Sequence, residues 1–268
     1  MADNKPSAHH EDSQKLPSQA GVSKRAGSGL SEDETLHALR RNLQKTTQRI
    51  ATAARAAGRD PEEITLLPVT KFHPVESISG LADLGVTDVA ENREQEARDK
   101  AEKLPGMRFH MIGQVQTKKA NAVARWASSV HSVDSHKLDD DLDRGIALPI
   151  EREQRTEGYA LPVFLQYSVD GDTSRGGIQG DALMQLAEHV ETLKNVTLAG
   201  VMVVPPLDSA AESVFRHARM MCDSLAERVG RRLQLSAGMS ADLEKAIAAG
   251  SDIVRVGTDI MGPRPVAF

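Results

Sequence analysis

From about residue 60 onward, short runs of β-branched and other apolar residues alternate with longer segments whose apolar residues recur every three or four positions. The short runs predict strands and the longer segments predict amphipathic helices. The expected strands cover residues 64–70, 88–91, 108–113, 129–134, 162–169, 197–204, 233–237 and 253–256. The expected helices cover residues 75–84, 93–104, 117–127, 136–148, 181–193, 210–229 and 241–249. Eight strands alternating with helices predict an α/β fold, a single (β/α)8 barrel of the TIM type.

The alternation alone does not distinguish a closed barrel from an open, doubly wound sheet. No G-x-G-x-x-G sequence follows the first expected strand, which disfavours the dinucleotide-binding form of the open sheet. The charged, aperiodic residues 149–160 predict a surface insertion before the fifth strand.

The residues before the barrel divide into a tail and a helix. Residues 1–30 contain many small and polar residues and few large apolar ones, which predicts a disordered tail. From Ser31, apolar residues recur at helical spacing, and Ser31 with Glu34 forms a capping box. This extra N-terminal helix is expected to end near Gly58. One folded domain is expected over residues 31–268.

The composition favours a protein that binds small molecules. The chain of 268 residues has a formal net charge of −5 and 3% aromatic residues, whereas a nucleic-acid-binding protein usually presents a basic face with stacking side chains. The single cysteine, Cys222, cannot form an internal disulfide, and the first residues lack a signal-peptide pattern. No apolar run approaches the roughly 18 residues that cross a bilayer. We expect a cytoplasmic protein without nucleic-acid or membrane partners.

The first expected strand is followed at once by Lys71. Barrels place their chemistry at the carboxyl ends of their strands. An amine that is desolvated there, close to other cations, loses pKa and forms Schiff bases with carbonyl compounds. Taken alone, Lys71 is better explained as a solvated charge at a strand end. The other strand ends decide between the two interpretations.

The loops after the last two expected strands fit a phosphate site. Gly238 and Gly257 let the backbone approach an anion closely, while Ser236, Ser240 and Thr258 add hydroxyl donors. Ser240 also stands at the expected N-cap of the helix over residues 241–249. Either loop alone is an ordinary strand-to-helix turn. Two such loops on consecutive strands favour a phosphate.

Arg255, inside the last expected strand, has three possible partners: the phosphate, a ring nitrogen or a carboxylate in the rim. Facing a pyridine nitrogen, it would keep that nitrogen unprotonated and make the ring a weak electron sink. The histidines lack the spacing of a metal site. His110 is expected to be a hydrogen-bonded residue in or behind the pocket. A G-x-S-x-G serine hydrolase motif is absent.

Seven short motifs follow one another between residues 31 and 262. They are Pro68-Val69-Thr70-Lys71; Glu91-Asn92 with Gln95-Glu96; Phe109-His110-Met111-Ile112-Gly113 with Gln116 and Lys119; His131-Ser132-Val133-Asp134-Ser135; Gly200-Val201-Met202; Gly238-Met239-Ser240; and Arg255-Val256-Gly257-Thr258 with Ile260 and Gly262. With these motifs the chain resembles the YggS/PROSC family of pyridoxal phosphate homeostasis proteins, which are related to the amino-terminal barrel of alanine racemase. It departs from the usual family pattern at Ala90, Gln114, Lys118, Ser168 and Ala237.

The resemblance implies a barrel of the alanine racemase N-terminal kind that binds pyridoxal 5'-phosphate (PLP) as a covalent aldimine on Lys71. It also implies that Asn92 lies near the ring substituents, that the cup after strands seven and eight holds the phosphate, and that Arg255 approaches the ring nitrogen. The expected cofactor-binding residues are Lys71, Asn92, Ile112, Ser132, Met202, Ser236, Gly238, Met239, Ser240, Arg255, Gly257 and Thr258.

The function that the resemblance implies is PLP homeostasis, by a monomer that carries, buffers or delivers the cofactor to recipient apoenzymes without appreciable turnover. The alternative is a small single-domain PLP-dependent amino-acid racemase. A racemase needs a second acid–base group, and of Tyr159 and Tyr167 only Tyr167 lies near a strand end, where packing in the rim is the favoured interpretation. A lysine-dependent aldolase is disfavoured because its lysine is expected later in the barrel.

Overall fold

The computed structural model describes residues 32–152, 155–156 and 158–264, so the predicted tail and Ser31 of the predicted capping box lie outside the described residues. The strands are β1 Thr65–Pro68, β2 Asp88–Glu91, β3 Arg108–Met111, β4 Ala127–Val133, β5 Leu161–Tyr167, β6 Val196–Val203, β7 Gln234–Ser236 and β8 Ile253–Val256. The α-helices are α1 Glu32–Ala56, α2 Val75–Asp83, α3 Glu94–Lys103, α4 Ala120–Trp126, α5 His136–Glu151, α6 Gly180–Val190, α7 Ala211–Val229, α8 Leu243–Ala248 and α9 Thr258–Met261. Short 3-10 helices are η1 Pro61–Glu63, η2 Thr117–Lys119 and η3 Thr173–Arg175.

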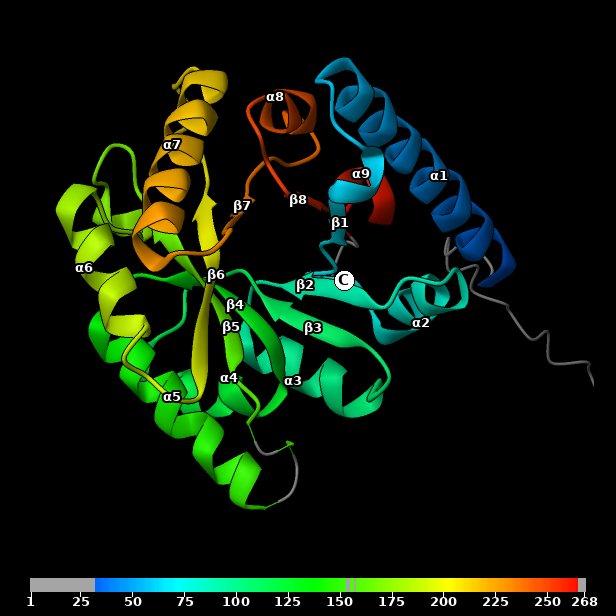
Figure 1. Cartoon of the computed structure of the whole chain (residues 1–268). Coiled ribbons are helices and arrows are strands. Elements are labelled where there is room, and N and C mark those ends of the chain that lie inside the picture. The colour runs from blue at the N-terminus through cyan, green and yellow to red at the C-terminus, as the bar shows by residue number, and fades with distance from the viewer. Residues whose placement is uncertain (1–31, 153–154, 157, 265–268) are drawn as a thin grey trace, which may run out of the picture.

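The strands form one parallel sheet in the order β1-β8-β7-β6-β5-β4-β3-β2. Its two ends meet through a parallel bridge between Val69 and Ala90, beside which the N–H of Thr70 donates to the Ala90 carbonyl at 3.0 Å. The sheet is therefore a nearly closed barrel with helices around it (Figure 1). This confirms the predicted (β/α)8 architecture over the open sheet.

Helix α1 covers one side of the barrel, as expected for the extra N-terminal helix. Leu39, Ile50 and Ala54 are buried on one face and join a core cluster with Val254 of β8. Figure 1 shows α1 in blue beside α2, α8 and α9. Gly58, at a φ of +69°, turns the chain after the helix end, close to where the sequence predicted it.

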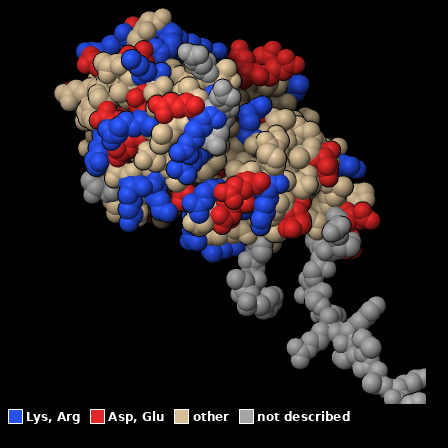
Figure 2. Space-filling model, turned by 90° about the horizontal axis from the view of Figure 1, so that it is seen from below, with Lys and Arg blue, Asp and Glu red and all other residues tan. Residues whose placement is uncertain are grey.

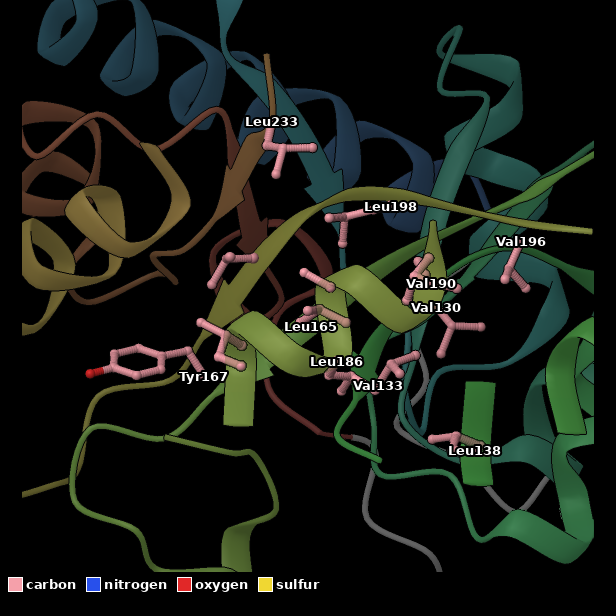
Figure 3. Close-up of a cluster of buried hydrophobic side chains, with 14 of the residues drawn as sticks. Val130, Val133, Leu138, Leu165, Tyr167, Leu186, Val190, Val196, Leu198 and Leu233 are labelled. Atoms are coloured by element: carbon pink, nitrogen blue, oxygen red, sulfur yellow. The ribbon is translucent and has the colours of Figure 1, made fainter. Parts of the chain in front are cut away.

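Apolar side chains form two layers outside the barrel and one small cluster inside it. Figure 3 shows part of the larger outer layer, which contains Leu165 of β5 with Leu186 and Val190 of α6. The inner cluster consists of Leu67, Val69, Ala90, Phe164, Met202 and Ile253. The interior of the barrel is thus filled by packed side chains and is not a pore.

Two segments differ from the sequence prediction. Helix α5 runs through Pro149 to Glu151, so the start of residues 149–160 is helix and not a surface insertion. Pro149 is buried, and its packing offsets the hydrogen bond that proline cannot donate. The predicted helix over residues 117–127 is the 3-10 turn η2 followed by the shorter α4, and Ala127 already belongs to β4.

One buried carboxyl group has no partner. Asp139, in the first turn of α5, is fully buried, and neither of its carboxylate oxygens has a hydrogen-bond partner in the described part of the chain. Burial raises the pKa of Asp139 to about 8, and the nearby charges of Asp140 and Asp134 act in the same direction. Asp139 is therefore largely protonated at neutral pH.

The surface carries both signs of charge. Figure 2 shows Lys and Arg interspersed with Asp and Glu on the face seen from below. Among the described residues no helix has the length and apolar character needed to span a membrane, and no group of three or more His, Cys, Asp or Glu side chains is arranged to hold a metal ion.

Candidate functional site

Lys71 lies half-buried just beyond β1, at the carboxyl rim of the barrel. The next residue, Phe72, has a φ of +69°, an uncommon conformation for an aromatic residue. Its N–H donates to Glu96 Oε1 at 2.6 Å. Its ring packs under the guanidinium groups of Arg93 and Arg264, at 5.1 and 3.6 Å. These contacts hold the turn that follows Lys71.

A buried ion network supports the same turn. Lys100 of α3, which is 6% exposed, donates to the Thr70 carbonyl at 2.9 Å, to Glu91 Oε1 at 2.6 Å and to Glu96 Oε1 at 2.7 Å. The Thr70 hydroxyl donates to the same oxygen of Glu91 at 2.7 Å. Burial raises the pKa of Glu91, and the Lys100 ammonium opposes that shift. The residues on both sides of Lys71 are therefore tied to one network.

Unpaired donors gather in the loops after β7 and β8. The backbone N–H groups of Ser240, Gly257 and Thr258, and the hydroxyls of both side chains, make no hydrogen bond with any described residue. A Cβ built on Gly257 would lie 3.6 Å from Val69, so this anion cup (Ser240, Gly257 and Thr258) adjoins the segment that leads to Lys71. N–H and O–H donors of this kind fit the oxygens of a phosphate.

Helix α1 joins the two loops of the anion cup. Arg49 donates to the Ser240 carbonyl at 3.1 Å and to Glu244 at 2.8 Å, and it also pairs with the Asp259 carboxylate. One guanidinium group therefore spans the loop after β7 and the start of α9. The sequence analysis missed Arg49, because it lies 191 positions from Ser240 and no local pattern links them.

The predicted N-cap role of Ser240 is wrong. Helix α8 begins at Leu243 with Asp242 at its N-cap, and Asp242 Oδ1 accepts from the N–H of Met239 at 2.6 Å. The carboxylate of Asp242 closes the turn that Ser240 was expected to close. Gly238, at a φ of +92°, lets the chain pass Ala246 in this turn, where a Cβ would approach to 2.5 Å.

Other predicted site residues lie around the mouth of the barrel. Ile112 and Met202 line a cavity of about 280 Å³ there, and neither Lys71 nor Asn92 is among its lining residues. The cavity also contains Arg175, which the sequence analysis did not single out.

Ser132 is buried, and its hydroxyl donates to the Gly113 carbonyl at 2.6 Å. A Cβ on Gly113 would lie 2.0 Å from the carbonyl oxygen of Asn92, so glycine is required for β2 and β3 to end side by side. Ser132 and Gly113 therefore support the rim near Asn92.

Arg255 and Ser236 lie deeper inside the barrel than the sequence indicated. Arg255, 3% exposed, donates to Ser236 Oγ at 2.7 Å and to the Val203 carbonyl at 2.9 Å. Burial lowers the pKa of Arg255 to about 10, which leaves it charged at neutral pH. Ser236 holds Arg255 in place, and its hydroxyl also lies 3.0 Å from Nδ1 of His131.

Tyr167 points away from the barrel interior. Phe164 of the same strand stacks on His131 inside the barrel, with ring centroids 4.2 Å apart, and alternation along β5 turns Tyr167 outward. Its ring meets His217 of α7 edge-on at 5.6 Å, and burial raises its pKa. Figure 3 shows its hydroxyl directed away from the outer core layer. This agrees with the predicted packing role of Tyr167.

Comparisons with known proteins identify the family. The model of the alanine racemase N-terminal domain family matches residues 35–265. A pyridoxal phosphate homeostasis protein of Corynebacterium glutamicum is 52% identical over 219 residues, which cover 82% of this chain and 99% of the relative. The chain belongs to the pyridoxal phosphate homeostasis protein family. An Escherichia coli relative of the same name is 36% identical over 231 residues, covering 83% of this chain and 95% of the relative.

Solved structures agree with this family membership. PipY of Synechococcus elongatus, solved with PLP bound, is 31% identical with a TM-score of 0.68, covering 80% of this chain and 100% of PipY. An alanine racemase of Clostridium difficile, at 15% identity and a TM-score of 0.65, covers 84% of this chain and 59% of the racemase, and shares the fold alone. The predicted resemblance and the predicted fold class are confirmed.

Proposed function

We propose that this protein binds PLP at the carboxyl rim of its barrel and carries or delivers the cofactor without appreciable turnover. The anion cup is the observation that carries the proposal, because its unpaired donors lie beside the segment that leads to Lys71. The names of the relatives and the PLP bound to PipY support it. When bound, PLP supplies an aldehyde and an electron-accepting ring.

Each group of the site has a role in holding this ligand. The amine of Lys71 attacks the aldehyde and, with loss of one water molecule, forms a Schiff base at Nζ. The anion cup donates to the phosphate, each hydrogen bond to a charged oxygen contributing about 1.5–3 kcal/mol. Arg255 has donors and no acceptor, so a ring nitrogen that faces it must be unprotonated. Such a ring stabilises negative charge poorly, which favours carriage over catalysis.

The outward direction of Tyr167 supports the carrier over a single-domain racemase. Racemisation requires acid–base groups on both faces of the reacting carbon. Lys71 can supply one of them. The Tyr167 ring packs against His217 of α7 on the outer side of β5, and the cavity that Tyr167 lines with Ile112 and Met202 does not include Lys71.

Titration with PLP, followed by near-visible absorbance, tests the phosphate assignment. The double variant Ser240→Ala, Thr258→Ala loses two hydrogen bonds to charged oxygens, so its dissociation constant should rise at least about 100-fold. Ser224→Ala, an exposed position of α7, is the matched control and should bind as the wild type does. Equal affinity in the double variant would reject the anion cup as the phosphate site.

Proton exchange at the α-carbon of L-alanine tests the absence of turnover. The loaded protein, incubated in deuterated water, should produce neither deuterated L-alanine nor the D isomer faster than free PLP does. A rate on the order of 1 s⁻¹ or more, abolished by both Lys71→Ala and Tyr167→Phe, would contradict the carrier function and indicate a racemase.

A further inference from the structure

A continuous chain of hydrogen bonds crosses the interior of the barrel. Its successive contacts are Arg255 Nη1 to Ser236 Oγ at 2.7 Å, Ser236 Oγ to His131 Nδ1 at 3.0 Å, His131 Nε2 to Ser129 Oγ at 2.9 Å, Ser129 Oγ to His110 Nδ1 at 2.6 Å, and His110 Nε2 to Asp88 Oδ1 at 2.9 Å. We call these six residues the barrel chain. It begins at Arg255, in the proposed cofactor site, and ends at Asp88 of β2.

The two ends of the barrel chain differ in their access to water. Arg255, Ser236 and His131 are 3%, 0% and 1% exposed. Asp88 is the first residue of β2, so it lies at the amino end of the barrel, opposite the carboxyl rim. The side chains of Asp88 and His110 are 24% and 18% exposed. The barrel chain therefore connects the buried Arg255 to a water-accessible pair at the opposite end.

The charged groups at the two ends fix which atom donates and which accepts in each hydrogen bond of the barrel chain. Arg255 can only donate hydrogen bonds. Burial alone would raise the pKa of Asp88, but hydrogen bonds from His110, Arg108 and Thr87 outweigh it and hold that pKa well below its usual value. Asp88 is therefore ionised and can only accept.

Counting donors and acceptors between these ends places every proton. Ser236 accepts from Arg255, so its own proton goes to Nδ1 of His131. His131 must then carry its proton on Nε2 and donate to Ser129. Ser129 in turn donates to Nδ1 of His110, whose Nε2–H faces the carboxylate.

The surroundings of His131 agree with a neutral ring. Burial lowers the pKa of His131 well below its ordinary value, and the charges of His110 and Arg255 act in the same direction. The other ring against it, Phe164, carries no charge. Around His110 the titratable or charged neighbours are Asp88, His131 and, through its ion pair with Asp88, Arg108.

We propose that His131 is a positioning residue that fixes Arg255 through the barrel chain and couples it to the protonation of His110 at the amino end of the barrel. A second proton taken from water by Nδ1 of His110 turns that atom from an acceptor into a donor. Ser129 then faces two donors unless His131 moves its single proton to Nδ1. In that case Ser236 faces two donors, one of them Arg255.

The first arrangement leaves the Ser129 proton without an acceptor and does not alter Ser236. The second leaves the Ser236 proton without an acceptor, and it is the one that our proposal takes, so the support of Arg255 changes with the state of His110. The inference rests on the proposed function only for the identity of the ligand that Arg255 faces. The order of protons in the barrel chain can be measured without any cofactor.

Ring-nitrogen NMR of ¹⁵N-histidine-labelled, cofactor-free protein reads this order directly, because it distinguishes the two tautomers and the doubly protonated ring. At pH 8 His131 should be neutral with its proton on Nε2. Its tautomer should change over the same pH interval in which His110 gains its second proton. Asp88→Asn removes the acceptor-only end and should populate both tautomers of His131 at pH 8. Asp83→Asn, the same change at an exposed position of α2, should leave the spectrum of His131 unchanged.

A second readout connects the barrel chain to the ligand. His131→Leu should weaken PLP binding about 10-fold, and the absorbance of its bound PLP should no longer respond to the protonation of His110. His131→Gln, whose amide can accept from Ser236 and donate to Ser129, should restore both properties. Equal behaviour of the two variants would contradict the positioning role.

The two proposals fail in different ways. A wild-type protein that binds no PLP rejects the proposed function, while the NMR result still decides the order of the barrel chain. A His131 that carries its proton on Nδ1 at pH 8, is doubly protonated there, or does not respond to His110, overturns the inference whether or not PLP binds. If His131→Leu does not fold, Asp88→Asn and the wild-type titration still decide it.

Discussion

Replacement of Lys100 by methionine tests whether the buried ion network holds the turn around Lys71. The Lys100 ammonium donates to the Thr70 carbonyl and to the carboxylates of Glu91 and Glu96, at 2.6 to 2.9 Å. Methionine keeps most of the side-chain volume and removes the charge and all three donors. Glu91, fully buried, then keeps only the Thr70 hydroxyl as a partner.

The expected loss is large because Lys100 and Glu91 are both buried. Removal of one partner from a buried ion pair costs about 3–5 kcal/mol, since the remaining charge stays buried without compensation. Glu91 is fully buried, so solvent screening reduces the cost of its unpaired charge little. The Glu96 side chain is 24% exposed, so the loss of Lys100 costs less there. Lys100→Met should therefore lower the free energy of unfolding by about 3–5 kcal/mol and weaken PLP binding, because Thr70 and Phe72 lose their common support.

Urea unfolding, followed by the fluorescence of the single tryptophan, Trp126, measures the first effect. The midpoint should fall by about 1–2 M urea. Lys103→Met, at an exposed position of the same helix, should change stability by less than about 0.5 kcal/mol. Adding Glu91→Gln to Lys100→Met should recover part of the loss. Unfolding of Lys100→Met at the same urea concentration as Lys103→Met would refute the reasoning.

Three further results are expected. The folded-state pKa of Asp139, about 8, lies above the ordinary value, so the wild type loses stability by up to about 1.4 kcal/mol per unit as the pH rises from about 4 to 8. Asp139→Asn should melt above the wild type at pH 8, with a difference that shrinks towards pH 5; parallel melting curves would contradict this. Gly113→Ala drives a Cβ into the Asn92 carbonyl and should lower the melting temperature by several degrees in calorimetry, whereas an unchanged value would show that the rim can shift. Arg49→Met should weaken PLP binding in an absorbance titration, because the loops at Ser240 and Asp259 lose their bridge; unchanged affinity would exclude a role for α1.

The sequence predicted the fold because the barrel is built from local patterns. Each strand and helix has its own apolar period, and eight such units favour a barrel, but the closure of β1 on β2 is seen only in the structure. Lys71 and Gly257 of the anion cup were singled out in the sequence because their chemistry depends on their position at strand ends. The helix through Pro149 was missed because buried packing overrides the local preference of proline.

The parts that the sequence did not predict depend on distant contacts. Ser240 lost the N-cap position to Asp242, which lies only two positions further on, and spacing alone could not choose between them. Arg49 of α1 and Lys100 of α3 contact Ser240 and Thr70, which lie 191 and 30 positions away along the chain. The barrel chain did leave a signal, since His131 stands inside a predicted strand, where a buried polar side chain needs hydrogen-bond partners. Its hydrogen-bond partners came only from the structure.

Reduction of the PLP-loaded protein with borohydride, followed by peptide mapping in a mass spectrometer, tests the central claim most directly, because it converts a Schiff base into a stable amine at the residue that formed it. We expect one pyridoxyl adduct, on Lys71, and none in the same treatment of Lys71→Arg. An adduct spread over several surface lysines, or placed on Lys100, Lys118 or Lys119, would contradict the assignment of Lys71 as the residue that holds the cofactor.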